Sequence, residues 1–143
     1  MAGARLGFAI GAASLIEDLT KIKYSTNPYN INRLTLAAGS AALDDDAYYM
    51  DNCKKIIQTR EQAAQQLAAL GFEMTDSKAN FLFARHPALE GEALYLALKD
   101  RGILVRHFNR DRIRDYLRIT VGTPDQMQAL IKAVTQILQE RNV

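Results

Sequence analysis

Five arginines lie within thirteen residues of the sequence, and no other group in the chain has a clearer capacity for chemistry. Arg106 and Arg118 stand in two apolar stretches with a turn between them. If the two stretches are strands that pair, their guanidinium groups come together. A guanidinium holds a carboxylate or a phosphate through two parallel hydrogen bonds, so we expect this pair to bind such an anion. The cluster consists of Arg106, Arg110, Arg112, Arg114 and Arg118.

Arg118 is the sharper candidate of the two, because an unpaired charge between Leu117 and Ile119 would be costly inside an apolar strand. For Arg106 and Arg118, a role as simple surface charges stays open as the alternative. The three arginines of the turn are interpreted as a solvated face beside two aspartates. Phe108 and Tyr116 are the only nearby aromatic residues, too few stacking platforms for a nucleic-acid interface.

The composition is that of a globular chain of about one domain. Its 143 residues are 48% hydrophobic and 24% charged, and a net charge of +2 is too small to imply a polyanionic partner. One cysteine and two histidines far apart in sequence predict no disulfide and no metal site. No run reaches the roughly 20 apolar residues of a membrane span. We therefore expect a cytoplasmic protein with neither a membrane nor a nucleic-acid partner.

Residues 46–143 alternate between helical and strand patterns. Their order predicts an α+β fold, in which helices pack on a mostly antiparallel sheet. In the first helix, a stripe at spacings of three and four that includes Tyr49, Cys53, Ile56 and Leu67 indicates a buried face, with Cys53 as an inert core thiol. Helices are predicted from Asp46 to a C-cap at Gly71, over 90–101, and after an N-cap at Thr123; strands are predicted at 72–75, 80–85, 103–108 and 117–121.

Residues 1–45 do not complete a unit of this kind. We expect a buried strand at 5–11, a helix with Ser14 as N-cap, a loop at 24–32 and a buried helix of small residues at 33–43. A strand and two helices without sheet partners are typical of the end of another domain. The sequence therefore predicts a domain boundary between residues 45 and 46.

Three segments together resemble a known family. They are Ala2-Gly3-Ala4-Arg5-Leu6-Gly7-Phe8, then Ala79-Asn80-Phe81-Leu82, then Gly102-Ile103-Leu104-Val105-Arg106 followed by Tyr116-Leu-Arg-Ile-Thr-Val-Gly-Thr-Pro124. In order and spacing they resemble the C-terminal part of histidinol-phosphate aminotransferases, fold type I enzymes that use pyridoxal 5′-phosphate. The resemblance extends over essentially the whole chain. It implies a remnant of the large cofactor-binding domain at 1–45 and the small C-terminal domain at 46–143.

The resemblance also implies a role for each candidate residue. Arg5 is similar to the arginine that holds the cofactor phosphate, and Arg118 to the one that holds the carboxylate or phosphate of the substrate. Arg106 is similar to a second arginine for the substrate phosphate, and Asn80 is a further candidate for substrate contact. The implied reaction, in histidine biosynthesis, converts L-histidinol phosphate and 2-oxoglutarate to imidazole-acetol phosphate and L-glutamate. The loop at 24–30 is similar to one that approaches the neighbouring subunit in family homodimers.

One departure from the family pattern limits what the chain is expected to do. In the family, a Schiff-base lysine precedes the segment that carries Arg5, and no lysine of this sequence stands in the matching place. We expect that the chain is truncated or comes from a damaged reading frame. In isolation it should be inactive and should not bind the cofactor stably. The alternatives are a non-enzymatic α+β interaction module, or a fragment of a related aminotransferase or of a phosphothreonine-type decarboxylase.

Overall fold

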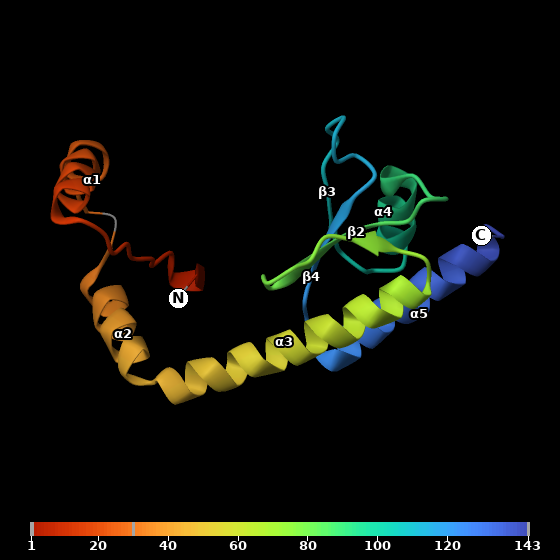
Figure 1. Cartoon of the computed structure of the whole chain (residues 1–143), viewed down its shortest axis with the longest axis horizontal. Coiled ribbons are helices and arrows are strands. Elements are labelled where there is room, and N and C mark those ends of the chain that lie inside the picture. Colours follow the sequence, from red (N-terminus) through yellow and green to blue (C-terminus); the bar gives the residue numbers. More distant parts are fainter. Residues whose placement is uncertain (1, 30, 143) are drawn as a thin grey trace. The chain divides into compact units, whose positions relative to one another are not determined.

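The computed structural model of the chain describes residues 2–29 and 31–142. The chain divides into two compact units, Met1–Asp51 and Asn52–Val143. The division falls within helix α3 (Asp46–Ala69), whereas the boundary predicted from the sequence lies just before that helix. Figure 1 shows the elements in chain order.

The first unit consists of helices joined by irregular segments. A short 3-10 helix, η1 (Ala2–Ala4), precedes α1 (Ala13–Thr26), α2 (Arg33–Asp44) and the start of α3. In α1, Lys21 pairs with Glu17 one turn earlier, at 3.0 Å. Helix α2 begins at Asn32, whose side chain accepts a hydrogen bond from the backbone N–H of Thr35 at 2.8 Å. This N-cap satisfies one of the free amides of the first turn and confirms the predicted start of the helix.

Several other expectations for the first unit are wrong. No strand forms at 5–11, because a strand exists only through pairing and the described part of this unit contains no second strand. Helix α1 starts at Ala13 after an Ala12 N-cap without a side-chain bond, so Ser14 does not cap it; the helix also runs on to Thr26, which shortens the predicted loop. No residue of α2 is buried, since a unit with so few elements cannot cover every face of a helix.

The second unit is an antiparallel sheet covered by helices, as predicted. The sheet has the order β1-β2-β4-β3, and each neighbouring pair of strands is antiparallel. The strand predicted at 103–108 is much shorter, because only two of its residues join the ladder. The elements are β1 (Glu73–Met74), β2 (Phe81–Arg85), α4 (Gly91–Asp100), β3 (Arg106–His107), β4 (Leu117–Thr120) and α5 (Pro124–Glu140).

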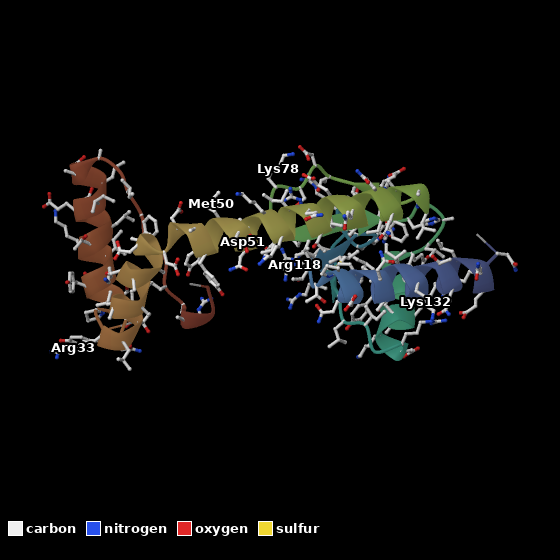
Figure 2. The ribbon with its side chains drawn as sticks, turned by 90° about the horizontal axis from the view of Figure 1, so that it is seen from below. Arg33, Met50, Asp51, Lys78, Arg118 and Lys132 are labelled. Atoms are coloured by element: carbon white, nitrogen blue, oxygen red, sulfur yellow. The ribbon has the colours of Figure 1, made fainter. Side chains whose placement is uncertain are left out.

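One face of the sheet and three helices enclose the core of the second unit. Leu82 and Ala84 of β2 and Leu117 and Ile119 of β4 are buried, and they belong to one cluster with side chains of α3, α4 and α5. Helices α3 and α5 lie side by side in Figures 1 and 2. Because side chains alternate along a strand, the other face of the sheet carries residues 81, 83 and 85 of β2 and 118 and 120 of β4. The largest fully buried side chains are Leu67, Leu98, Leu117, Val134 and Ile137.

Two helix ends in the second unit follow the sequence signals closely. Gly71 has φ +86° after the end of α3, in the left-handed region where glycine is favoured, as a C-cap requires. Thr123 caps α5: its side chain accepts from the N–H of Gln126 at 3.3 Å, and the Gln126 side chain accepts from the N–H of Thr123 at 2.9 Å. This reciprocal capping box confirms the predicted start of the last helix.

The apolar stripe of α3 is buried only in its second half. Ala63 and Leu67 lie in the core, but Tyr49, Cys53 and Ile56 are exposed. The prediction of Cys53 as a core thiol is therefore wrong, because α3 meets the core of the second unit only from Thr59 onward. None of the helices that the structure describes is long and apolar enough to cross a membrane.

Candidate anion-binding site

The face of the sheet away from the core carries the two arginines that the sequence singled out. Arg106 of β3 and Arg118 of β4 are direct partners in the antiparallel ladder, which confirms that these two strands pair. Opposite residues of such a pair project from the same face, with Cβ atoms about 4.5 to 5.5 Å apart. Both arginines are exposed. Two cationic side chains therefore share one small area of the surface.

The environment of Arg118 follows from the alternation along β4. Leu117 and Ile119 are 0% and 3% exposed, whereas Arg118 and Thr120 are exposed. The expectation that Arg118 is a costly charge within an apolar strand is thus wrong, because its side chain belongs to the solvent face. The capacity of Arg118 to bind an anion therefore depends on the groups around its guanidinium. Figure 2 labels the Arg118 side chain.

Aromatic rings, and not carboxylates, accompany the two guanidinium groups. The guanidinium carbon of Arg118 lies over the ring of Phe81, 5.6 Å from its centre, and that of Arg106 lies over Phe108 at 5.4 Å. Within the described residues, neither arginine forms an ion pair or donates a hydrogen bond. A ring face attracts a cation without using its N–H donors, so those donors stay available to an external anion.

A third arginine of the same face, Arg85, is neutralised inside the protein. Glu73 is its partner in the β1–β2 ladder. The Glu73 carboxylate accepts a hydrogen bond from Nε at 2.8 Å, and the same oxygen forms an ion pair with Nη2 at 2.7 Å. This hydrogen bond is the main cause that raises the pKa of Arg85 above its ordinary value, so Arg85 stays charged and paired. Among the described residues, neither Arg106 nor Arg118 has such a carboxylate partner, and this contrast marks them as the two binding candidates.

Asn80, the further candidate for substrate contact, lies in the turn that leads into β2. Its side chain is exposed, and its carbonyl accepts a hydrogen bond from the N–H of Val121 at 2.9 Å, just beyond the end of β4. The buried Arg60 of α3 donates from Nη1 to the carbonyl of Ala79 at 3.1 Å and so holds the same turn from the core side. Sequence reasoning missed Arg60, whose charged side chain gives no sign of burial in the apolar pattern of α3.

The remaining arginines of the cluster lie in the turn between β3 and β4. Arg110, Arg112 and Arg114 are exposed, as interpreted from the sequence, and in the part of the chain with described structure they form no ion pair with the neighbouring aspartates. The base of the turn is fixed by His107, which donates from Nε2 to the carbonyl of Arg114 at 2.6 Å. The turn therefore extends from the site without adding a buried or constrained cation to it.

Arg5, the candidate for the cofactor phosphate, lies in the first unit. It follows η1 with φ 56°, in the left-handed region that residues other than glycine seldom occupy. Its side chain is exposed and forms no ion pair with any described residue. Backbone strain of this kind is concentrated at functional sites, and an unpaired guanidinium there suits a phosphate group.

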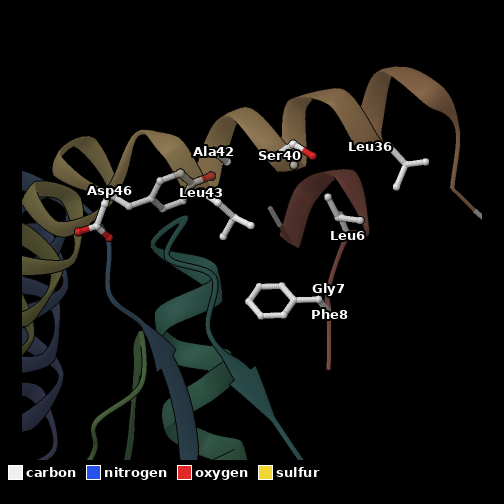
Figure 3. Close-up of a pocket in the computed structure, with 10 residues that line it drawn as sticks. Leu6, Gly7, Phe8, Leu36, Ser40, Ala42, Leu43 and Asp46 are labelled. Atoms are coloured by element: carbon white, nitrogen blue, oxygen red, sulfur yellow. The ribbon is translucent and has the colours of Figure 1, made fainter. Parts of the chain in front are cut away.

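A cavity of about 620 Å³ lies in the first unit, and no pattern in the sequence predicts it. Figure 3 shows side chains of the segment after Arg5, of α2 and of the start of α3 around it, Phe8, Leu36 and Leu43 among them. Most of its lining is apolar, and Phe8 and Leu43 are largely exposed. The cavity offers a surface for apolar contact and little chemistry of its own.

The fold and the sequence together place the chain in a class of protein. The chain has the α+β fold of fold type I aminotransferases. Residues 1–134 match the sequence model of the family described as aminotransferase class I and II, so the chain belongs to this family.

Individual relatives are similar over nearly the whole chain. Histidinol-phosphate aminotransferase of Brachyspira hyodysenteriae is 48% identical over 97% of this chain and 39% of its own length. The solved histidinol-phosphate aminotransferase of Clostridium acetobutylicum matches 89% of this chain and 39% of its own with a TM-score of 0.75 at 26% identity. That of Sinorhizobium meliloti, solved with pyridoxal-5′-phosphate, matches 98% of this chain and 38% of its own with a TM-score of 0.82 at 24% identity, which shows a common fold. The chain thus spans about two fifths of the length of these relatives.

Proposed function

We propose that this chain forms the C-terminal part of a pyridoxal-phosphate-dependent aminotransferase that acts on L-histidinol phosphate. The reaction, a step of histidine biosynthesis, would convert L-histidinol phosphate to imidazole-acetol phosphate and 2-oxoglutarate to L-glutamate. In this proposal residues 1–45 belong to the large domain and 46–143 form the small domain. The 48% identity to a histidinol-phosphate aminotransferase over 97% of the chain supports it.

The observation that carries the proposal is the Arg106–Arg118 pair, opposite in register and without a carboxylate among the described residues. A phosphate monoester is a dianion with three acceptor oxygens near neutral pH, so two guanidinium forks can share it. Arginine keeps its charge at every working pH, and the site therefore stays cationic. Asn80, in the turn that leads into β2, is proposed to contact the same substrate through its exposed amide.

The residues of this chain suit the phosphate end of the cofactor. Arg5, exposed and unpaired among the described side chains, is proposed to hold that phosphate. Pyridoxal 5′-phosphate supplies, when bound, a ring that withdraws electrons from the reacting carbon. The lysines of the chain are not in the position of the family's Schiff-base lysine, so these residues bind and orient and do not move the reacting proton. We therefore expect no transamination by this chain alone.

The setting of the proposed enzyme is a homodimer in the cytoplasm. The similarity of the loop around Pro28 to a family loop that approaches the neighbouring subunit supports the dimer. A biosynthetic role among related bacterial enzymes supports the cytoplasm. The proposed small-molecule partner is a phosphorylated amino or keto compound, for which the exposed arginine pair is suited.

Binding measurements on the chain itself test the phosphate site. L-histidinol phosphate is titrated into the protein and into Arg118→Ala, with L-histidinol as the matched ligand without phosphate. Loss of a hydrogen-bonded charge pair costs about 1.5 to 3 kcal/mol, so Arg118→Ala should weaken binding about tenfold or more. Arg106→Ala should act in the same direction, whereas Arg112→Ala, in the exposed turn, should change Kd by less than about twofold. Equal effects of Arg118→Ala and Arg112→Ala would contradict the assignment.

A further inference from the structure

The two positive charges of the arginine pair repel each other, and other contacts must offset this repulsion. Like charges directly opposite each other in an antiparallel pair repel, and Arg106 and Arg118 stand in that relation. No carboxylate in the described structure pairs with either of them. Without further contacts, two long exposed side chains would turn away from each other into solvent and lose the geometry that a shared anion needs.

Each guanidinium has its own aromatic ring, and the two rings come from different parts of the sheet. Phe81 belongs to β2, on one side of the central strand β4, and Phe108 follows β3, on the other side. The ring faces lie 5.6 and 5.4 Å from the guanidinium carbons of Arg118 and Arg106. The two cations are thus held at separate supports and do not compete for one.

The choice of ring for Arg118 is specific. Its direct partner in the β2–β4 ladder is Phe83, yet its guanidinium lies over Phe81, the diagonal neighbour. The ring of Phe83 is stacked instead on Tyr116, with centroids 4.7 Å apart and planes 12° from parallel. The ring of Tyr116 in turn lies under the guanidinium of Arg85, the arginine that Glu73 neutralises. Phe83 therefore supports the paired arginine of the face, and Phe81 supports the unpaired one.

The core does not account for these rings. Phe81, Phe83 and Phe108 are half-buried, and none belongs to the core cluster that joins the sheet to its helices. The turn that leads into Phe81 is fixed by the hydrogen bond from Arg60 to the carbonyl of Ala79. The ring therefore projects from backbone that is itself anchored to α3.

We propose that Phe81 and Phe108 are positioning residues, which hold the guanidinium groups of Arg118 and Arg106 in place for a shared anion. The positioning rests on the contacts of the chain alone, and its consequence for phosphate rests on the proposed function. The two rings act separately: Phe81 on Arg118, and Phe108 on Arg106.

The side-chain Nε–Hε resonances of the two arginines, recorded by NMR without phosphate, test the positioning directly. Phe81→Leu keeps an apolar side chain of similar size but removes the ring. It should move the Arg118 resonance toward its position in an unstructured peptide and leave that of Arg106 in place. Phe108→Leu should do the reverse. Phe83→Leu is the matched control, on the same strand and face, and should leave both resonances in place. Amide spectra show that each variant is folded.

Titration with inorganic phosphate then measures the consequence for binding. Phe81→Leu and Phe108→Leu should each weaken binding about two- to fivefold, as expected for the loss of a cation–π contact at a partly exposed site. Phe81→Tyr keeps the ring face and should retain the affinity. If Phe81→Leu leaves the Arg118 resonance unmoved, or moves it no more than Phe83→Leu does, the positioning role is wrong. If the resonances respond as expected but Arg118→Ala binds phosphate like the wild type, positioning stands and the proposed function fails.

Discussion

A single methyl group at Gly91 should destabilise the second unit, although helix propensity predicts the opposite. Gly91 is the buried first residue of α4. A Cβ built there would lie 2.8 and 2.9 Å from the carbonyl carbon and Cα of Asp115, and nearer still to the carbonyl oxygen of Arg114. These are backbone atoms, so no side chain can rotate to make room. Gly91→Ala must therefore displace the segment that enters β4.

The balance of two effects gives the size of the change. Replacing glycine by alanine in a helix favours folding by at most about 1 kcal/mol. Overpacking of a close contact costs about 1 to 3 kcal/mol, and the contacts with Asp115 need about 0.5 Å of movement to reach ordinary separation. The steric cost is the larger, so we expect Gly91→Ala to lower the free energy of unfolding by roughly 1 to 2 kcal/mol.

Urea denaturation followed by far-ultraviolet circular dichroism measures this change, and amide NMR spectra show where it acts. Gly102→Ala is the control: its Cβ would meet no atom within 4 Å, but φ is +75°, so its cost comes from the backbone alone. Only Gly91→Ala should move the amide resonances of Arg114 and Asp115. A stabilised Gly91→Ala variant, or one with those resonances unmoved, would refute the reasoning.

Two further changes test the core and the last helix. Leu98→Ala should lower the free energy of unfolding, measured by urea denaturation, by about 2 to 5 kcal/mol, because Leu98 is 1% exposed. Leu104→Ala, at a site 79% exposed, should change it by less than about 0.5 kcal/mol. Similar values for both variants would show that the core is misplaced. Thr123→Ala removes the hydroxyl that accepts the Gln126 N–H in the α5 capping box and should lower the free energy of unfolding by about 1 kcal/mol in the same measurement. Thr123→Ser keeps a hydroxyl and should retain stability. An equal loss in both variants would exclude capping as the cause.

The second unit could be predicted from its sequence because its signals are local and agree with one another. Alternation in 117–121 fixes which side chains of β4 are buried, and the Thr123 capping box fixes where α5 begins. The pairing of Arg106 with Arg118 followed from two strands and one turn. The support of Arg118 by Phe81 is different in kind, because it depends on the order β2-β4 in the sheet, which no local pattern reveals.

The first unit could be predicted less well, because its expected features depend on partners elsewhere. The sequence predicts a buried strand at 5–11 and a buried helix of small residues at α2, yet pairing and burial both require neighbouring elements. The described part of the unit has no second strand, and α2 has no buried residue. The helix itself still forms, since its Asn32 cap and internal hydrogen bonds are local.

The exposure of Arg118 follows from the burial of its neighbours. Leu117 and Ile119 fix β4 on the core, and with a side-chain period of two they can be buried together only if Arg118 faces away. A slip of one residue in the β2–β4 register would turn Arg118 into the core and both apolar side chains into solvent, at a cost that no surface contact could offset. The buried core therefore fixes the direction in which the Arg118 side chain leaves the sheet, and in our proposal Phe81 has only to hold the guanidinium at its end.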